Sequence, residues 1–449
     1  ELGDFTLIAG RNNTGKTFLV YTLYGFLKMW KQWPAIESYL VNRDGTKNAP
    51  DIGFERLVVT LVNEGKVQYT LDRATINKER NILIRELAHS FSYDALFSVF
   101  SSQRDKFKEA ALEIEVGEFP VPSQQIQFNY PTGDIFSISY DKDKLTIVRD
   151  RVGKMDLRHV RNELSYLYLR FLFPDLPEAF ILSAERFGIS LFYKELDFTK
   201  NRLVDLLQNI GDAEDNEYFS PYILIDKTTS RYALPIKDNI DYTRSLSDFR
   251  NERSEVFEDK LFEDIKEMMS GYYRSSGDEI HFKSKARGQK GFDIPLHLAS
   301  SSARGLSDLY FFLRHRAKKN QMLIIDEPES HLDTANQILL ARLLARFVRA
   351  GIKVLVTTHS DYIVKEVNNL IMLSYAFNDK KAVVQKLKYK EEEFLLPSSV
   401  RAYVAENNGL VACELDEFGL NMPVFDETID SINRASNELA SHLEEGRHD

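Results

Sequence analysis

The sequence has little cysteine and no long apolar run. Its one cysteine, Cys413, excludes an intrachain disulfide framework and a zinc site with several cysteine ligands, so we expect a reducing compartment, the cytoplasm. No apolar run approaches the roughly 18 residues needed to cross a bilayer, which predicts no membrane association. The chain begins Glu1-Leu2-Gly3-Asp4, without an initiator methionine or a signal peptide, and we interpret this as an incomplete N-terminus.

Positive charge is also in deficit. Lys and Arg number 58 against 68 Asp and Glu, which gives a formal net charge of −10. Such a chain can bind nucleic acid only through a local basic face. Lys283, Lys285, Arg287 and Lys290 form one short basic stretch, for which a solvated hairpin face is the alternative. With 449 residues, 43% of them hydrophobic, the chain can form two or three globular domains, and wholesale disorder is excluded.

The first third of the chain combines an α/β start with a β-rich stretch. An apolar run at 5–9 predicts a buried strand, and the apolar spacing over 17–31 predicts a helix directly after a glycine-containing loop. Between about 53 and 150 the pattern predicts antiparallel strands, interrupted by a helical stretch at 76–112. These strands are predicted at 57–62, 68–71, 114–116, 126–128 and 145–148.

The remainder returns to an α/β pattern. A helix is predicted at 156–172 and a strand at 180–183, and residues 188–275 are expected to be largely helical, with an amphipathic segment at 257–269. A hairpin-like segment at 279–299 follows. The last predicted elements are a helix at 302–317, a strand at 322–326, a helix at 333–350 and a strand at 353–357.

Residues 10–17 fit the phosphate-loop pattern G-x-x-x-x-G-K-[ST] at every fixed position. Backbone N–H groups of such a loop, at the start of a helix, surround a β-phosphate. Lys16 would reach the β- and γ-phosphates, and the hydroxyl of Thr17 would take one position on Mg²⁺. The predicted nucleotide-binding residues of this loop are Gly10, Asn12, Asn13, Thr14, Gly15, Lys16 and Thr17.

Two acids and a histidine follow later apolar strands. Asp326 and Glu327 close the run Leu323-Ile324-Ile325, and burying adjacent carboxylates is costly unless a cation compensates them. We therefore predict that Asp326 binds Mg²⁺ and that Glu327 polarises the attacking water. His359 ends the next strand, 33 residues beyond Asp326, where it can hydrogen-bond a γ-phosphate. The predicted catalytic residues are Glu327, His359 and Lys16, and the predicted metal ligands are Thr17 and Asp326.

These motifs resemble those of the ABC-type ATPases of the SMC/Rad50-like and OLD-like branch. Residues 10–17, 325–329, 330–333 and 357–360 are similar to its Walker A, Walker B, D-loop and H-switch. The resemblance implies an α/β P-loop NTPase head of ABC type, with an antiparallel β subdomain and an inserted helical arm, that uses ATP and Mg²⁺. Residues 298–306 stand where the branch has its signature motif, although the usual Ser-Gly-Gly core is absent. By resemblance, Ser300 and Ser301 would contact the γ-phosphate bound by another protomer.

The resemblance also implies a division of the chain and a role for one arginine. It places an N-terminal ATPase lobe at 1–180, a helical arm at 181–278, a C-terminal ATPase lobe at 279–380 and a C-terminal extension at 381–449. Ser183-Ala184-Glu185-Arg186 is similar to a Pro-Ala-Glu-Arg turn that opens the arm in these proteins. Arg186 is expected to approach the nucleotide or a partner subunit, with a structural salt bridge as the alternative.

Several functions are compatible with an ATPase of this branch. Residues 360–449 are too few for the Toprim nuclease domain of OLD proteins, so we expect a separate effector. The resemblance then implies the sensor or scaffold subunit of a bacterial anti-phage defence system of PARIS or Septu type. It would form a head-to-tail homo-oligomer, control a Toprim or HNH nuclease and respond to a phage protein. The alternatives are a repair or recombination ATPase that clamps DNA, and a non-enzymatic, nucleotide-gated interaction module.

Overall fold

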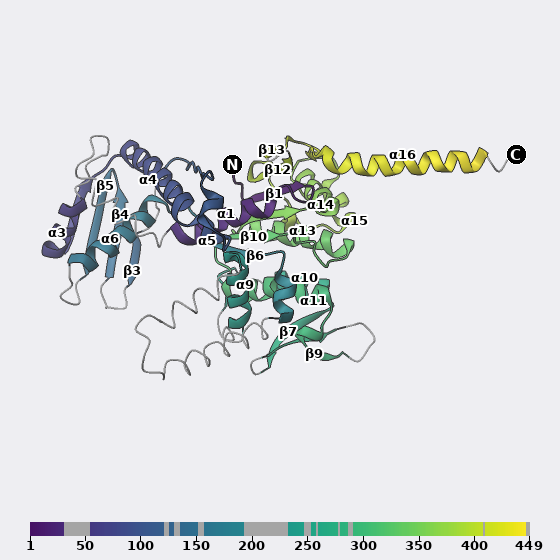
Figure 1. The fold of residues 1–449 in the computed structure, drawn as a ribbon, viewed down its shortest axis with the longest axis horizontal. Helices are drawn as coiled ribbons and strands as arrows, with labels where there is room; N and C mark the ends of the chain where they lie inside the picture. The colour runs from purple at the N-terminus through teal and green to yellow at the C-terminus, as the bar shows by residue number, and fades with distance from the viewer. Residues whose placement is uncertain are drawn as a thin grey trace. The chain divides into compact units, whose positions relative to one another are not determined.

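The chain forms two compact units in a computed structural model (Figure 1). Unit 1 comprises residues 1–24 and 179–449, and unit 2 comprises residues 25–178. None of the helices described is long and apolar enough to cross a membrane. The division into four segments stays a prediction. The residues that the structure describes are 1–30, 54–120, 125–129, 135–150, 157–192, 232–246, 253–256, 259–276, 279–285, 291–406 and 409–445.

Unit 1 is built on a six-stranded sheet of order β13-β12-β1-β11-β10-β6. All pairs are parallel except β12 with β13, and every residue of β1 and β10 is buried, as in a sheet covered on both faces. The strands predicted at 5–9, 180–183, 322–326 and 353–357 are confirmed. In chain order the strands are β1 (Phe5–Gly10), β6 (Ala179–Leu182), β10 (Met322–Asp326), β11 (Lys353–Thr358), β12 (Val400–Glu406) and β13 (Gly409–Ala412).

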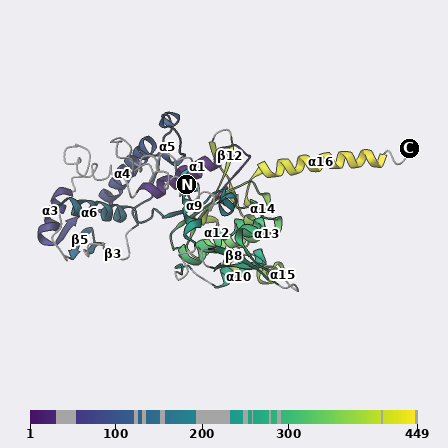
Figure 2. The same cartoon turned by 60° about the horizontal axis from the view of Figure 1, so that its bottom comes forward.

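The helices of unit 1 follow the sheet strands. Helix α1 (Lys16–Met29) begins directly after the loop that leaves β1. Helices α13 (Thr334–Arg349) and α14 (Asp361–Met372) lie side by side (Figures 1 and 2), each with an N-cap side chain that accepts a backbone N–H, Asp333 and Ser360 respectively. The helix predicted at 302–317 is interrupted. It consists of α11 (Ser301–Gly305), α12 (Ser307–Phe311) and a π-helical turn, η5 (Phe312–Arg316).

A second, three-stranded antiparallel sheet in unit 1 has the order β7-β8-β9. Its strands are β7 (Gly271–Ser276), β8 (Glu279–Ser284) and β9 (Asp293–Pro295). The prediction that 188–275 is largely helical is therefore wrong from 271 onward. Helices α9 (Leu234–Ser245) and α10 (Asp259–Met269) agree with it, whereas 193–231 and 247–252 lie outside the described residues.

Smaller elements complete unit 1, and all of them except η4 follow α14 in the chain. The helix α15 and the short 3-10 turns η6 and η7 precede β12, while η4 precedes α11. A two-stranded hairpin, β14 with β15, follows β13, and α16 is the last helix described. These elements are η4 (Leu296–Leu298), α15 (Lys380–Leu387), η6 (Glu391–Glu393), η7 (Pro397–Ser399), β14 (Leu415–Asp416), β15 (Gly419–Leu420) and α16 (Pro423–Glu445).

Unit 2 contains the antiparallel β subdomain, a four-stranded sheet of order β2-β5-β4-β3. Helix α6 contacts strands β3 and β4 of this sheet and also packs against α3 (Figure 1). The strands are β2 (Lys66–Thr70), β3 (Ile126–Asn129), β4 (Ile135–Asp141) and β5 (Lys144–Asp150). The helices are α3 (Phe54–Glu64), α4 (Arg73–Asp94), α5 (Leu96–Val99), the short 3-10 turn η3 (Arg104–Phe107) and α6 (Leu157–Leu172).

Three predictions for unit 2 differ from the structure. Residues 57–62, predicted as a strand, belong to α3, in which Leu57, Val58 and Leu61 are buried while Val59 is exposed. That spacing places the three buried side chains on one helical face, so packing overrides the β propensity of the valines. Residues 114–116 form no strand, and the helical stretch predicted at 76–112 ends at Asp94 before two short turns.

Candidate functional site

The glycine loop between β1 and α1 needs glycine for two physical reasons. Gly10 and Gly15 have φ values of 145° and 84°, which side chains rarely adopt, and Asn13 is also left-handed at 63°. At Gly10 an added Cβ would also lie 2.7 Å from the carbonyl oxygen of Ala405 in β12. The two fixed glycines of the pattern over residues 10–17 therefore stand where the loop conformation favours glycine.

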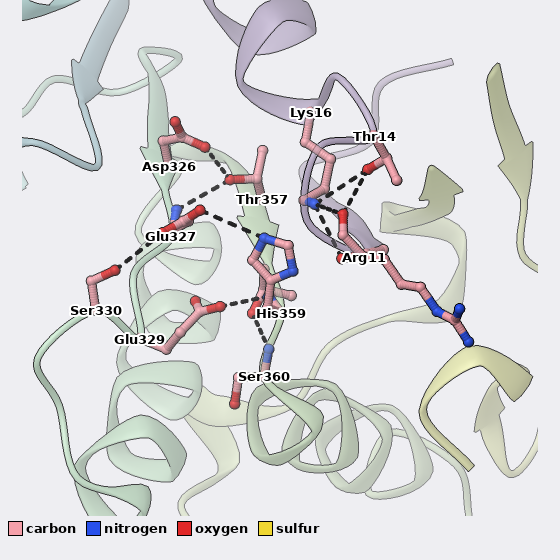
Figure 3. A network of polar contacts seen from close by, with 12 residues as sticks. Arg11, Thr14, Lys16, Asp326, Glu327, Glu329, Ser330, Thr357, His359 and Ser360 are labelled. Carbon is pink, nitrogen blue, oxygen red and sulfur yellow. Dashed lines mark hydrogen bonds and ion pairs between the residues drawn. The ribbon is translucent and has the colours of Figure 1, made fainter. Parts of the chain in front are cut away.

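Lys16 lies inside this loop (Figure 3). Its Nζ donates hydrogen bonds to the carbonyl oxygens of Gly10, at 3.1 Å, and Arg11, at 2.8 Å, and lies 3.4 Å from the hydroxyl of Thr14. Burial lowers the pKa of Lys16, and the nearby acids Asp326, Glu327 and Glu329 oppose that shift. The lysine charge is thus held beside three carboxyl groups from a segment more than 300 residues away in the chain.

Asp326, at the end of β10, is fully buried. The hydroxyl of Thr357 donates to its Oδ1, whereas its Oδ2 is buried without a hydrogen-bond partner. Burial raises the pKa of Asp326, and hydrogen bonds from the hydroxyls of Thr357 and Thr17 oppose that rise. An orphaned carboxylate oxygen beside a threonine hydroxyl suits Mg²⁺, which prefers oxygen ligands and few carboxylates when phosphates supply the others. Among the residues described, no group of three or more His, Cys, Asp or Glu could hold a metal ion.

Glu327 follows in a left-handed conformation, with φ of 50°. Its backbone N–H donates to the hydroxyl of Thr357 at 3.1 Å. Its Oε1 lies 3.5 Å from Nε2 of His359, and its Oε2 accepts a hydrogen bond of 3.3 Å from the hydroxyl of Ser330. Figure 3 shows the His359 ring turned toward Glu327, on the side that faces the glycine loop. The structure thus brings Lys16, Asp326, Glu327 and His359 together, as the sequence motifs predicted.

Glu329 is a residue that sequence reasoning did not assign. Its Oε1 accepts a 2.5 Å hydrogen bond from the backbone N–H of His359, and its Oε2 is buried without a partner. Burial raises the pKa of Glu329. The carboxyl group therefore ties the turn after β10 to the turn after β11. Only its place next to Pro328 in the acidic motif could have drawn attention to it.

Arg186 contacts the main chain of the acidic motif. Its side chain is buried, and its guanidinium donates to three main-chain carbonyls, those of Ser183 at 3.0 Å and of Asp326 and Glu327 at 2.8 Å each. Its hydrogen bonds thus join the turn after β6 to the turn after β10 through main-chain carbonyls.

The serine-rich segment caps a short helix. The hydroxyl of Ser300 accepts the backbone N–H of Ala303 at 3.2 Å, and Ser301 is the first residue of α11. The hydroxyl of Ser302 donates to the carbonyl of His331 at 2.9 Å, which joins this helix to the connection after Glu327. The predicted contact of Ser300 and Ser301 with a nucleotide bound by another protomer stays a prediction.

Of the comparisons with known proteins, the family comparison concerns the same chemistry. Residues 191–364 match the family model of an AAA ATPase domain. A comparison with curated proteins gives no significant match. The solved structures that this chain resembles include an SMC head domain from Pyrococcus furiosus bound to the C-terminal domain of ScpA. The sequence identity is 10% and the TM-score is 0.29, and the alignment covers 97% of this chain and 94% of that chain. The SMC head domain from Thermotoga maritima has 11% sequence identity and a TM-score of 0.28, and the alignment covers 92% of each chain. An SMC head bound to the C-winged helix domain of ScpA has 12% sequence identity and a TM-score of 0.29, and the alignment covers 92% of this chain and 91% of that chain.

The family match covers the acidic motif and the histidine, and the glycine loop completes the site from the other end of the chain. The protein is an ATP-hydrolysing enzyme with an α/β P-loop fold. Its fold class and enzyme class are therefore as the sequence predicted.

Proposed function

We propose that ATP binds on residues 10–17 and is hydrolysed by the group of side chains around Glu327. The observation that supports this most directly is the 3.5 Å approach of Glu327 to His359, on the side facing Lys16. In this arrangement Glu327 orients and polarises a water, and His359 donates a hydrogen bond to the γ-phosphate. Catalysis of phosphoryl transfer rests on such positioning and on charge stabilisation.

Mg²⁺ would be held by Thr17 and Asp326, where it would neutralise phosphate charge. The buried Oδ2 of Asp326, which has no hydrogen-bond partner, supports this assignment. Lys16 would exchange the loop carbonyls that it now contacts for phosphate oxygens. Ser300 and Ser301 of a second copy would close the site over the γ-phosphate, so hydrolysis would depend on assembly.

Three variants test this proposal. Glu327→Gln should retain ATP binding and lose turnover by at least about 100-fold, because the amide cannot polarise water. Lys16→Ala should lose ATP affinity instead. Glu417→Gln, at an exposed position, is the matched control and should leave both unchanged. Turnover at the wild-type rate in Glu327→Gln would overturn the assignment.

At the level of biological role, we propose the ATPase subunit of a bacterial anti-phage defence system. It would act as a sensor and scaffold for a separate nuclease of Toprim or HNH type, released or rearranged by a phage protein. Support comes from the resemblance of the motifs to the OLD-like branch. Measuring the native mass of the protein, co-expressed with its genomic neighbour, tests this role. A stoichiometric complex with a nuclease is expected.

The alternative is an ATPase that clamps duplex DNA, as SMC/Rad50-like proteins do. The basic stretch at 283–290 is its main support, and two basic residues beside this stretch contact an acid. Asp293 pairs with Arg274 at 2.6 Å and with His281 at 3.0 Å. Of the four basic residues, Arg287 and Lys290 lie outside the described residues. A lone dimer whose ATPase activity rises with duplex DNA would favour this alternative over the defence role.

A further inference from the structure

A buried polar cluster behind the acidic motif has no place in the mechanism above. Its centre is Arg186, which follows β6, and its other charged member is Asp308 of α12. We propose that Arg186 is a positioning residue for Glu327 and that Asp308 is its buried counter-charge. This inference rests on the proposed role of Glu327 and deepens it, because it names what fixes that side chain in place.

The acceptors of Arg186 explain the positioning. Its Nη1 donates to the carbonyl of Asp326 and its Nη2 to the carbonyl of Glu327, both at 2.8 Å. Two successive carbonyls bound by one rigid fork fix the two peptide planes that follow these residues. Glu327 has φ of 50°, a conformation that persists only when its surroundings determine it. Holding these carbonyls therefore fixes the direction in which the Glu327 carboxylate leaves the main chain.

A planar guanidinium is needed for this contact. Arginine presents several N–H donors in a fixed fork, whereas lysine presents a compact point charge on a flexible stem. Nη1 also reaches the carbonyl of Ser183 at 3.0 Å, so one side chain joins the end of β6 to the end of β10. A lysine at position 186 would keep the charge and leave at least one carbonyl without its donor.

Asp308 supplies the opposite charge from another element. It is buried, its Oδ1 has no hydrogen-bond partner, and the charge of Arg186 opposes the rise that burial causes in its pKa. Ser307 and Thr243 also hydrogen-bond the carboxyl group and favour its charged form. Glu329, Asp326 and Glu327 act on Arg186 as further negative charges. Asp308 thus acts as a buried negative charge on Arg186 from another element.

The first experiment compares two buried arginines. Arg186→Lys should lower kcat for ATP hydrolysis by about 10- to 100-fold, since small misplacements of catalytic groups have effects of this size. Its Kd for Mg·ATP should stay within about twofold of the wild type.

Arg80→Lys is the matched control. Arg80 is fully buried in unit 2, where it donates to the carbonyls of Leu172 and Gly117 and pairs with Asp175 at 2.8 Å. The variant Arg80→Lys should have a lower free energy of unfolding and an unchanged kcat per folded molecule.

A second variant covers the case in which Arg186→Lys does not fold. Asp308→Asn keeps the size of the side chain and removes its charge. We expect a protein that is at least as stable as the wild type at pH 8 and turns over ATP several-fold more slowly, with unchanged Kd. A merely structural pair would not give slower turnover together with undiminished stability.

The outcomes separate this inference from the proposed function. Wild-type kcat in both Arg186→Lys and Asp308→Asn would overturn the positioning role, even if Glu327→Gln is inactive. Equal losses of kcat per folded molecule in Arg186→Lys and Arg80→Lys would also overturn it. Full turnover in Glu327→Gln would instead contradict the proposed function on which the inference rests.

Discussion

Gly10 shows how much a single residue contributes to the nucleotide loop. Its φ of 145° and the 2.7 Å that would separate an added Cβ from the carbonyl oxygen of Ala405 both exclude a side chain. We expect Gly10→Ala to lower the free energy of unfolding by about 1–3 kcal/mol and to weaken ATP binding. Gly188, in the helix over 186–192, has no atom within 4 Å of its added Cβ. Gly188→Ala should therefore be neutral or stabilising by about 0.5–1 kcal/mol. Chemical denaturation of both variants measures the difference, and equal losses would contradict this account.

The pH dependence of stability should report on Asp308. Burial raises the pKa of Asp308 from 3.8 to about 7, so the folded protein binds this proton more tightly than the unfolded chain does. Its contribution to stability is greatest at acidic pH and falls as pH rises from about 4 to about 7. Each tenfold difference in proton affinity corresponds to about 1.4 kcal/mol. Asp308→Asn should flatten this part of the stability curve, measured by denaturation at several pH values. An unchanged slope would show that another group is responsible.

The residues of the candidate site could be predicted from sequence, but the residues that contact its main chain could not. Lys16, Asp326 and His359 belong to motifs with fixed spacing, and the structure brings them together. Glu329 and Arg186 act through main-chain N–H and carbonyl groups, which every residue has. No side-chain pattern records such contacts, because they depend on where two distant turns meet in the folded chain.

At the scale of elements, strand β6 depends on a helix as well as on its neighbouring strand. It pairs with β10 on one side, and Asn239 of α9 bonds its main chain, donating to the carbonyl of Ile181 at 2.6 Å and accepting the N–H of Ser183 at 2.8 Å. Asn239→Ala should lower the free energy of unfolding by about 1–3 kcal/mol, because two buried main-chain groups lose their partners.

A second asparagine provides the comparison for Asn239→Ala. Asn368 of α14 bonds the main chain of Leu420 in the same two-sided way, at 3.2 and 2.8 Å, but at a partly buried hairpin. Asn368→Ala should cost less than Asn239→Ala in the same denaturation experiment, since water can replace the lost bonds. A larger loss for Asn368→Ala would mean that burial does not set the cost.

Element types were predicted best where the apolar pattern was long and unbroken. The buried strands β1, β10 and β11 carry continuous apolar runs and were placed correctly from sequence. Strand β12 was missed, because Arg401 and Tyr403 interrupt its apolar residues. Helix α3 was taken for a strand, since its valines favour strands and only packing against α6 selects the helix. Local propensity therefore does not predict whether a segment is a helix or a strand where long-range packing contacts determine it.

At the scale of the whole molecule, the chain interrupts one unit with another. Unit 2 is a continuous stretch of 25–178 with its own antiparallel sheet, whereas unit 1 is assembled from 1–24 and 179–449 and contains the entire candidate site. We expect calorimetry to show two unfolding transitions, since separate cores rarely melt as one.

A non-hydrolysable ATP analogue with Mg²⁺, at about 100 times its Kd, should stabilise only unit 1, by about 2.7 kcal/mol. That corresponds to a rise of several degrees in one transition. Lys16→Ala should abolish this rise and leave the other transition in place. A single transition that moves as a whole with nucleotide would show that the two units unfold together.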